Sequence, residues 1–184
     1  MAIAIGVIEF SSIARGVDTT DKMLKAARVD LLKTSTVCPG KYITIVSGRV
    51  DDVKSSMRVA RQHGAEYVVD TLEIPNIHEQ LIPAIVAGTV VEKPEAIGVM
   101  EFYSVTGGIS AADVAAKAAK IQMLEIRIAR GLGGKGFLVF TGEVSSVRSA
   151  VKACANALGE TGEITSHCVI ASPHKDLVKQ VLAQ

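Results

Sequence analysis

Apolar stretches of strand length recur in the same order in the two halves of this chain. Each half opens on an almost continuous apolar run, which predicts a buried strand. Residues 123–128 instead alternate along the chain, the period-two pattern of a half-buried strand. The strands expected in the first half are 4–10, about 29–37, 42–46 and 67–74, and those in the second are 96–102, 121–129, 137–140 and 164–170.

The first helix of each half is expected to begin at Asp18 or at Ser110. Asp21 and Asp113 stand three residues further on, which is the spacing of a capping box. The residue usually found at that position of a capping box is Glu or Gln.

The second helix of each half is expected after Gly48 or Gly142, with apolar residues spaced by three, four and three. A short closing helix is expected after each repeat's last strand. The resulting order, β-α-β-β-α-β, is that of a ferredoxin-like α/β unit, in the α+β arrangement of a split βαβ. The apolar faces expected to be buried are Val50, Val53, Met57 and Ala60, and Val144, Val147, Val151 and Cys154.

The sequence itself is duplicated. Residues 4–32 match residues 96–124 at 13 of 29 positions, beginning with Ala-Ile-Gly-Val-Ile-Glu-Phe against Ala-Ile-Gly-Val-Met-Glu-Phe. The duplication predicts two tandem domains, 1–92 and 93–184, joined near Glu92-Lys93-Pro94. Two related domains in one chain are typical of proteins that assemble with pseudo-symmetry.

Composition excludes several classes of function. The net charge is +1 and no basic face carries interleaved aromatic residues, so we expect no nucleic-acid partner. No apolar stretch has the length of a membrane span, and the start reads as a strand and not as a signal peptide. The three cysteines, an odd number, favour a reducing cytosol and free thiols.

The repeated sequence motifs resemble those of the bacterial microcompartment shell-protein family, and the resemblance covers essentially the whole chain. They are the opening strand, Asp-x-x-x-Lys-Ala-Ala in the first helix, and a turn ending in Gly-Lys before the third strand. The resemblance implies two tandem copies of a ferredoxin-like-derived microcompartment shell domain. It further implies a tile of the shell in the bacterial cytoplasm, built as a homotrimer of six-domain outline and joined to other shell proteins, without enzymatic activity.

The resemblance also assigns edges and pores. It places Lys25 and Lys117 where neighbouring tiles meet; the alternative interpretation is that both are ordinary solvated helix lysines. His78 and His174 precede the closing helices and are interpreted as structural or edge residues, not as catalysts or ligands. The pore loops correspond to the turns between second and third strands: Cys38, Pro39, Gly40 and Lys41, and Leu132, Gly133, Gly134 and Lys135.

Cys38 differs from the other two cysteines. Cys154 lies on a predicted buried helix face and Cys168 in an apolar strand, so both are expected in the core. Cys38 stands at a turn, and three copies around a three-fold axis would converge as soft ligands with one position open. The Cys-Pro-Gly-Lys motif resembles the pore-loop sequence of the tandem, trimeric shell proteins of propanediol-type compartments. The resemblance implies one 4Fe–4S cluster per trimer. It also implies redox enzymes of the compartment lumen as partners. Electron transfer and cluster delivery across the shell both stay open.

Other interpretations remain. Cys38 could be a free thiol, or one that binds zinc adventitiously, in a plain pore-forming tile for metabolites. A ferredoxin-like sensor could bind a small molecule between subunits. The loop at residues 131–136 resembles a phosphate-binding loop, but Ala129 stands where a Walker motif needs glycine, and Gly136 follows the lysine in place of Ser or Thr.

Overall fold

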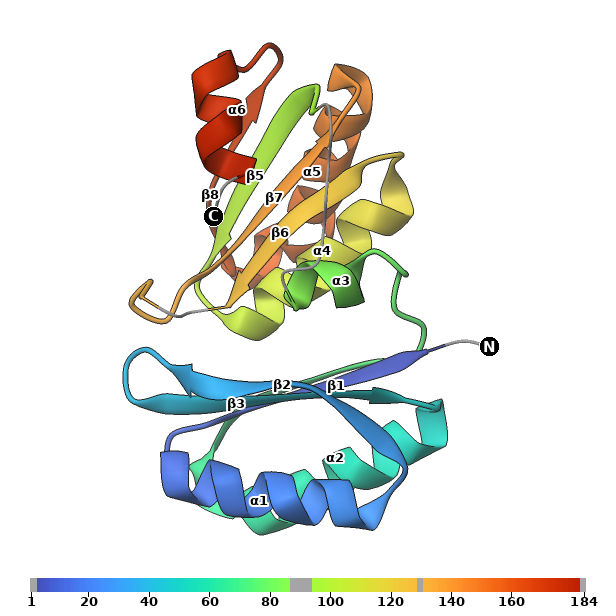
Figure 1. Cartoon of the computed structure of the whole chain (residues 1–184), viewed down its shortest axis with the longest axis vertical. Helices are drawn as coiled ribbons and strands as arrows, with labels where there is room; N and C mark the ends of the chain where they lie inside the picture. The colour runs from blue at the N-terminus through green and yellow to red at the C-terminus, as the bar shows by residue number, and fades with distance from the viewer. Residues whose placement is uncertain (1–2, 87–93, 129–130, 183–184) are drawn as a thin grey trace. The chain divides into compact units, whose positions relative to one another are not determined.

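The structure is a computed structural model, which describes residues 3–86, 94–128 and 131–182. Its contacts divide the chain into two units, 1–77 with 129–134, and 78–128 with 135–184. The boundary predicted between residues 92 and 93 lies in 87–93, outside the described residues. Each repeat contains one four-stranded sheet, and the two sheets can be followed in Figure 1.

The first repeat has the predicted order of elements, followed by a short helix. Its secondary structure is β1 (Ala4–Phe10), α1 (Ile13–Ala26), β2 (Val29–Val37), β3 (Lys41–Gly48), α2 (Val50–Gly64), β4 (Val68–Ile74) and α3 (Leu81–Ile85). A 3-10 turn, Ala65–Tyr67, joins α2 to β4.

The second repeat has the same order, so the predicted ferredoxin-like arrangement is confirmed in both copies. Its elements are β5 (Ala96–Phe102), α4 (Val105–Ala118), β6 (Gln122–Ile128), β7 (Gly136–Gly142), α5 (Val144–Leu158), β8 (Ile164–Ile170) and α6 (Lys175–Leu182). The predicted end of its second strand at residue 129 lies outside the described residues.

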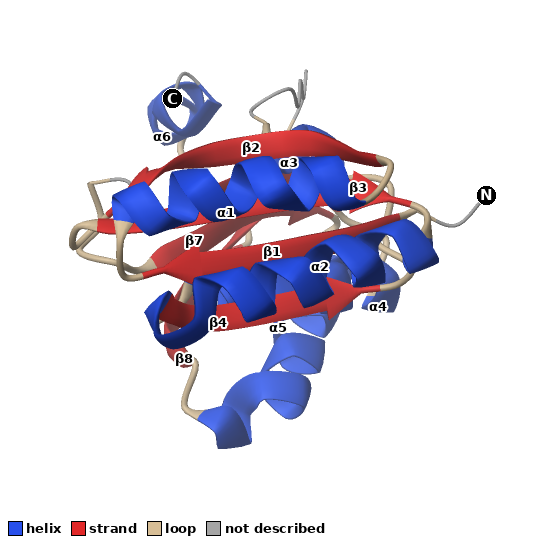
Figure 2. Ribbon diagram, turned by 90° about the horizontal axis from the view of Figure 1, so that it is seen from below, coloured by secondary structure: helices blue, strands red, loops and turns tan. Residues whose placement is uncertain are grey.

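Both sheets are antiparallel and have the same strand order, β2-β3-β1-β4 and β6-β7-β5-β8. The opening strand of each repeat is therefore central, which explains its apolar sequence: every residue of β1 is buried. Helices α1 and α2 lie side by side on one face of the first sheet (Figure 2). The core beneath them comprises Ala4, Ile8, Phe10, Met23, Tyr42, Val46, Val53, Met57 and Ala60.

The predicted start of the first helix was wrong in both repeats. The helices begin one and a half turns earlier, after N-cap residues Ser12 and Ser104, whose hydroxyls accept hydrogen bonds from Arg15 N and Gly107 N. Asp18 lies inside α1, where it pairs with Lys22 across one turn at 2.8 Å.

The period-two prediction for residues 123–128 was also incomplete. A register shift between Met123 and Glu125 marks a bulge, so Met123, Ile126 and Ile128 are all buried. An equivalent shift lies between Leu31 and Lys33 in β2. One extra residue in a strand moves every following side chain to the opposite face of the sheet. A simple alternating pattern of apolar residues does not reveal such an insertion.

A glycine in each central strand lets a neighbouring side chain approach closely. A Cβ atom at Gly98 would lie 2.4 Å from Phe140 Cε2, whereas one at Gly6 would lie 2.7 Å from Met57 Cγ. The Phe140 side chain is a rigid ring in the core, whereas the Met57 side chain is flexible. Substitution by alanine should therefore be tolerated better at Gly6 than at Gly98.

We therefore expect Gly98→Ala to lower the free energy of unfolding by about 1–3 kcal/mol, the usual effect of overpacking. Gly6→Ala should cost less, because the methionine can change rotamer. Urea unfolding of both variants measures the difference. Gly159→Ala is the control: nothing lies within 4 Å of its added Cβ, and its φ of −62° suits alanine. Equal losses at Gly6 and Gly98 would contradict the explanation.

Candidate functional site

The first predicted pore loop is the tip of the β2–β3 hairpin. Val37 pairs with Lys41, which leaves Cys38, Pro39 and Gly40 as a three-residue turn. Gly40 has a φ of +70°, a conformation that favours glycine. The Cys38 thiol is half-buried and makes no disulfide, so a single soft ligand per chain is presented on a short, fixed turn.

A buried carboxylate anchors this turn. Glu9 at the end of β1 is 3% exposed and accepts a hydrogen bond from Lys41 Nζ at 2.8 Å. Its second oxygen, Oε1, has no hydrogen-bond partner among the described residues. Breaking a buried pair of this kind is costly because it leaves a charge uncompensated. The pair therefore fixes the loop's last residue against the central strand.

The second predicted pore loop, residues 131–134, is rich in glycine with positive φ. Gly131, Gly133 and Gly134 have φ of +76°, +62° and +93°. A Cβ at either of the first two would meet nothing within 4 Å, so their backbone faces open space. Lys135 is 3.7 Å from Glu101, but both are about half-exposed, so this pair holds its loop far less firmly than Glu9 and Lys41 hold theirs.

The two loops come together in the first unit, with which residues 131–134 are grouped. A Cβ at Gly134 would lie 3.2 Å from the carbonyl oxygen of Cys38 and 3.6 Å from Pro39 Cδ. Both predicted pore loops thus contribute to one surface. The second loop joins two strands, as predicted, whereas a Walker loop leads into the N-terminus of a helix.

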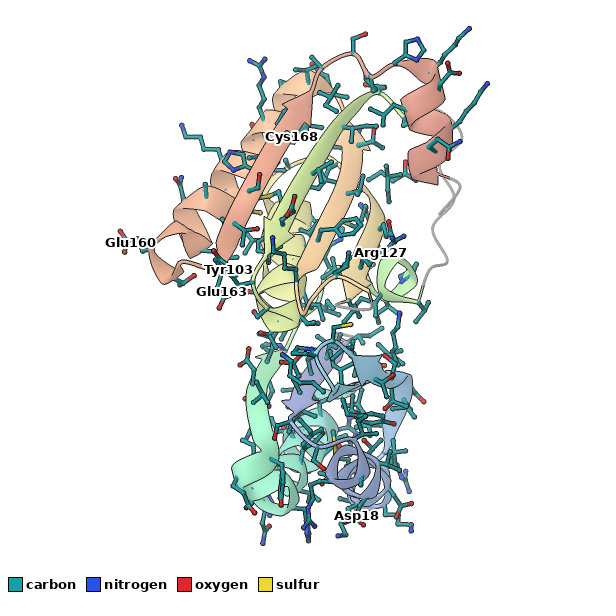
Figure 3. The ribbon with its side chains drawn as sticks, turned by 90° about the vertical axis from the view of Figure 1, so that its left-hand side faces the viewer. Asp18, Tyr103, Arg127, Glu160, Glu163 and Cys168 are labelled. Carbon is teal, nitrogen blue, oxygen red and sulfur yellow. The ribbon has the colours of Figure 1, made fainter. Side chains whose placement is uncertain are left out.

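The other two cysteines have different environments. Cys154 is buried as predicted, and its thiol donates to the carbonyl oxygen of Ala111 at 3.3 Å. Cys168, predicted to be in the core, is exposed (Figure 3). It lies on the edge strand β8 opposite Val99, on a strand whose central residues 166–168 are all exposed. An apolar sequence on an edge strand does not guarantee burial within one chain.

The predicted tile-edge lysines lie in the last turns of α1 and α4. Lys25 pairs with Asp21 at 2.6 Å, and both side chains are mostly exposed. Lys117 pairs with Asp113 at 2.5 Å, but that carboxylate is only 11% exposed. Lys25 is thus the freer of the two to meet a neighbouring molecule.

Each of the two histidines accepts a hydrogen bond within its own turn. His78 Nδ1 accepts from Gln80 N at 3.4 Å, and His174 Nδ1 accepts from Asp176 N at 3.3 Å. His78 N also donates to Asp113 Oδ1 at 2.9 Å. Sequence reasoning missed this role of Asp113 and that of Gln80; the recurrence of aspartate in both repeats was the available signal.

The described residues of one chain contain no group of three or more His, Cys, Asp or Glu that could hold a metal. None of the helices described reaches the length and apolarity that a bilayer crossing requires.

Comparisons with known proteins agree over the whole chain. The family model for the BMC domain matches twice, at residues 4–77 and 96–173. The bacterial microcompartment shell protein PduT of Citrobacter freundii is 38% identical over 182 residues, covering 99% of both chains. The carboxysome shell protein CcmK1 of Thermosynechococcus vestitus is 37% identical over 86 residues, covering 44% of this chain and 75% of its own.

Solved structures show the same similarity. A microcompartment protein from Desulfitobacterium hafniense superposes with a TM-score of 0.94 and 43% identity, covering 97% of this chain and 99% of that one. The fused permuted hexameric shell protein MSM0275 shares the fold with a TM-score of 0.60 at 21% identity, covering 86% of this chain and 82% of its own.

The two cysteines of the second repeat, Cys154 and Cys168, are expected to differ in thiol reactivity. Burial raises the pKa of the Cys154 thiol to about 11, so its reactive thiolate is scarce at neutral pH. We expect iodoacetamide to modify Cys168 in the native protein, and Cys154 only after unfolding, as read by peptide mass spectrometry. Cys168→Ser should remove the fast-labelled site. Equal labelling of Cys154 in the native protein would contradict the assigned burial.

Proposed function

The chain belongs to the BMC-domain family of bacterial microcompartment shell proteins, and on that premise we propose that three copies form a pseudohexameric tile with an iron–sulfur site at its centre. Membership of the family indicates the general function, which is that of a structural component of a microcompartment shell in the bacterial cytoplasm. The chain is related along its whole length to such a shell protein. The observation that carries the finer proposal is Cys38 on the β2–β3 turn, one half-buried soft ligand per chain.

The count of domains supports three-fold assembly. Two BMC domains per chain and heterologous contacts between them close into a ring of six when three chains combine. Other shell proteins would adjoin the edges of such a tile. The axis then relates three Cys38 thiols, which no single chain can bring together.

The donor chemistry of this turn fits an iron–sulfur cluster. Thiolate sulfur is the ligand that such clusters use, and the turn carries no carboxylate of its own that would favour a hard cation. Cys38 of each chain would hold one iron of a 4Fe–4S group, while the Glu9–Lys41 pair fixes the turn. Such a group supplies one-electron transfer when bound.

Two uses of the cluster remain compatible with this site. It would carry single electrons between the cytosol and lumen redox enzymes, or it would itself be delivered across the shell. The glycine loop supports a second candidate function, a plain pore for metabolites without a cluster. Its open backbone at Gly131 and Gly133 offers N–H groups to polar solutes.

Cys38→Ser tests the cluster. Anaerobically purified wild-type protein should be a brown trimer with about four irons, and the variant a colourless trimer, because serine replaces every thiolate ligand. Iron and sulfide assays on the sized oligomer make the measurement. Cys168→Ser is the matched control and should keep its iron, since Cys168 lies on β8 and not on the turn. A colourless wild-type trimer after reconstitution would leave the plain pore as the function.

The tile edge has its own test. Lys25→Ala should leave the trimer intact but abolish flat sheets in negative-stain electron microscopy, because the 74%-exposed Lys25 side chain is proposed to meet the next tile. Lys152→Ala is the control, an exposed lysine on α5. If the Lys25 variant forms sheets as extensive as the control's, Lys25 is an ordinary solvated lysine.

A further inference from the structure

We propose that the loop of the second repeat at residues 131–134 positions the cysteine of the first repeat. We call residues 131–134 the glycine loop, and residues 38–40 the cysteine turn. Gly134 and the buried Glu9 are the two positioning residues, because they support the cysteine turn from two different elements. The inference rests on the proposed iron–sulfur site, and it gives the glycine loop a part in that site.

The first support is a contact between two stretches of backbone. The glycine loop is grouped with the first unit, in which the cysteine turn lies. A Cβ added at Gly134 would lie 3.2 Å from the carbonyl oxygen of Cys38 and 3.6 Å from Pro39 Cδ. The nearest atom belongs to the backbone, so no side-chain rotation can relieve the contact. Any side chain at position 134 would displace the cysteine turn or lift the loop away from it.

The three positive-φ glycines of the loop differ in their surroundings. Gly131 and Gly133 have φ of +76° and +62°, and an added Cβ at either would meet nothing within 4 Å. Their left-handed backbone alone accounts for glycine at these positions. Gly134 has a φ of +93° and is crowded as well. Two separate requirements for glycine coincide there, and one of them is the cysteine turn.

The second support is the ion pair at the base of the cysteine turn. Lys41 pairs with Val37 across the hairpin, and its Nζ lies 2.8 Å from Glu9 Oε2. The Glu9 side chain is 3% exposed, and its Oε1 has no hydrogen-bond partner among the described residues. Burial of a carboxylate is unfavourable unless a paired charge offsets it. Glu9 therefore holds the ammonium group of Lys41 firmly, directly after the turn.

The second repeat contains the same two residue types without this burial. Glu9 faces Ile43 in the first sheet, and Glu101 faces Phe137 in the equivalent strand pair of the second. Lys135 and Glu101 are 3.7 Å apart, and both side chains are about half-exposed. Since the sequence pattern is shared, the surroundings make the difference. The buried anchor belongs to the loop that carries a thiol, and the loop without a thiol has a weak one.

Firm support matters at Cys38 because each chain offers one thiol on this turn. Such a ligand contributes fully to a shared site only when its direction is set in advance, since ordering it on binding would cost entropy. Contacts that orient a metal ligand typically change metal affinity about 10–100-fold when they are removed. Glu9 and Gly134 thus act through Cys38 and need not touch a bound group.

The first experiment examines the cysteine turn with no group bound. Full-length protein freed of iron by a chelator is treated with iodoacetamide, and labelling is followed by peptide mass spectrometry. We expect Gly134→Ala and Glu9→Gln to label several-fold faster at Cys38, because each variant releases a half-buried thiol from one support. The exposed Cys168 calibrates each sample, and the buried Cys154 stays unlabelled as long as the variant is folded.

Each variant has a control that makes the same exchange. Gly131→Ala introduces the same kind of left-handed strain without the contact, and Glu101→Gln removes a carboxylate from the half-exposed pair. Both controls should label Cys38 at the wild-type rate. Equal acceleration by Gly131→Ala, or a wild-type rate in Gly134→Ala, would overturn the role of Gly134. If Glu9→Gln labels Cys154 and is therefore unfolded, Gly134→Ala alone decides the proposal.

The second experiment measures the loaded protein after anaerobic reconstitution. Gly134→Ala should stay a trimer but release its iron to a chelator about 10-fold faster than wild type. Glu9→Gln leaves the charge of Lys41 uncompensated, and a nearby positive charge favours the reduced state. Its midpoint potential, followed by electron paramagnetic resonance, should therefore rise. Glu101→Gln should shift the potential less, because solvent screens the exposed pair.

The two experiments separate the positioning role from the iron–sulfur site itself. Faster labelling in both variants, with no iron bound even by wild type, would support the positioning of Cys38 and overturn the iron–sulfur function. If wild type binds iron and both variants match it in labelling, iron release and potential, the positioning role is overturned and the proposed function stands.

Discussion

Burial of one strand per repeat is the constraint on which this structure depends. β1 and β5 each pair on both sides, with β3 and β4 or with β7 and β8, and helices cover them. A strand with two neighbours satisfies its backbone completely, so its side chains can be almost entirely apolar. Gly6 and Gly98 remove the one Cβ that would hold the core away from the strand. The turns, edges and loops are positioned by these two strands.

The duplication then gives the same fold two different surroundings. The first repeat's closing helix is seated on the second repeat's edge strand, whereas the second repeat's closing helix has no such seat among the described residues of its own chain. Related residues therefore have unequal exposure. A duplicated domain also allows the two loops to diverge in sequence. The loop with Cys38 is anchored by a buried ion pair, and the glycine loop by a weak, exposed one.

Sequence reasoning succeeded where the signal was local and periodic. It gave the order of elements, the strand ends within a few residues, and the buried faces of α2 and α5. It misplaced the start of α1, because Ser12 and Asp18 are both good capping residues and only packing against the sheet decides between them. The bulge at residue 124 escaped detection, because one inserted residue leaves no mark on composition.

The sequence by itself determined the fold, its duplication and the family, because periodicity and recurring motifs can be read directly along the chain. Tertiary structure alone decided that Cys168 is exposed while Cys154 is buried, that Glu9 holds Lys41, and that Gln80 spans the edge of β6. These are contacts between residues distant in sequence. Whether an apolar or charged side chain is covered depends on which neighbour the fold brings to it, and no local pattern records that neighbour.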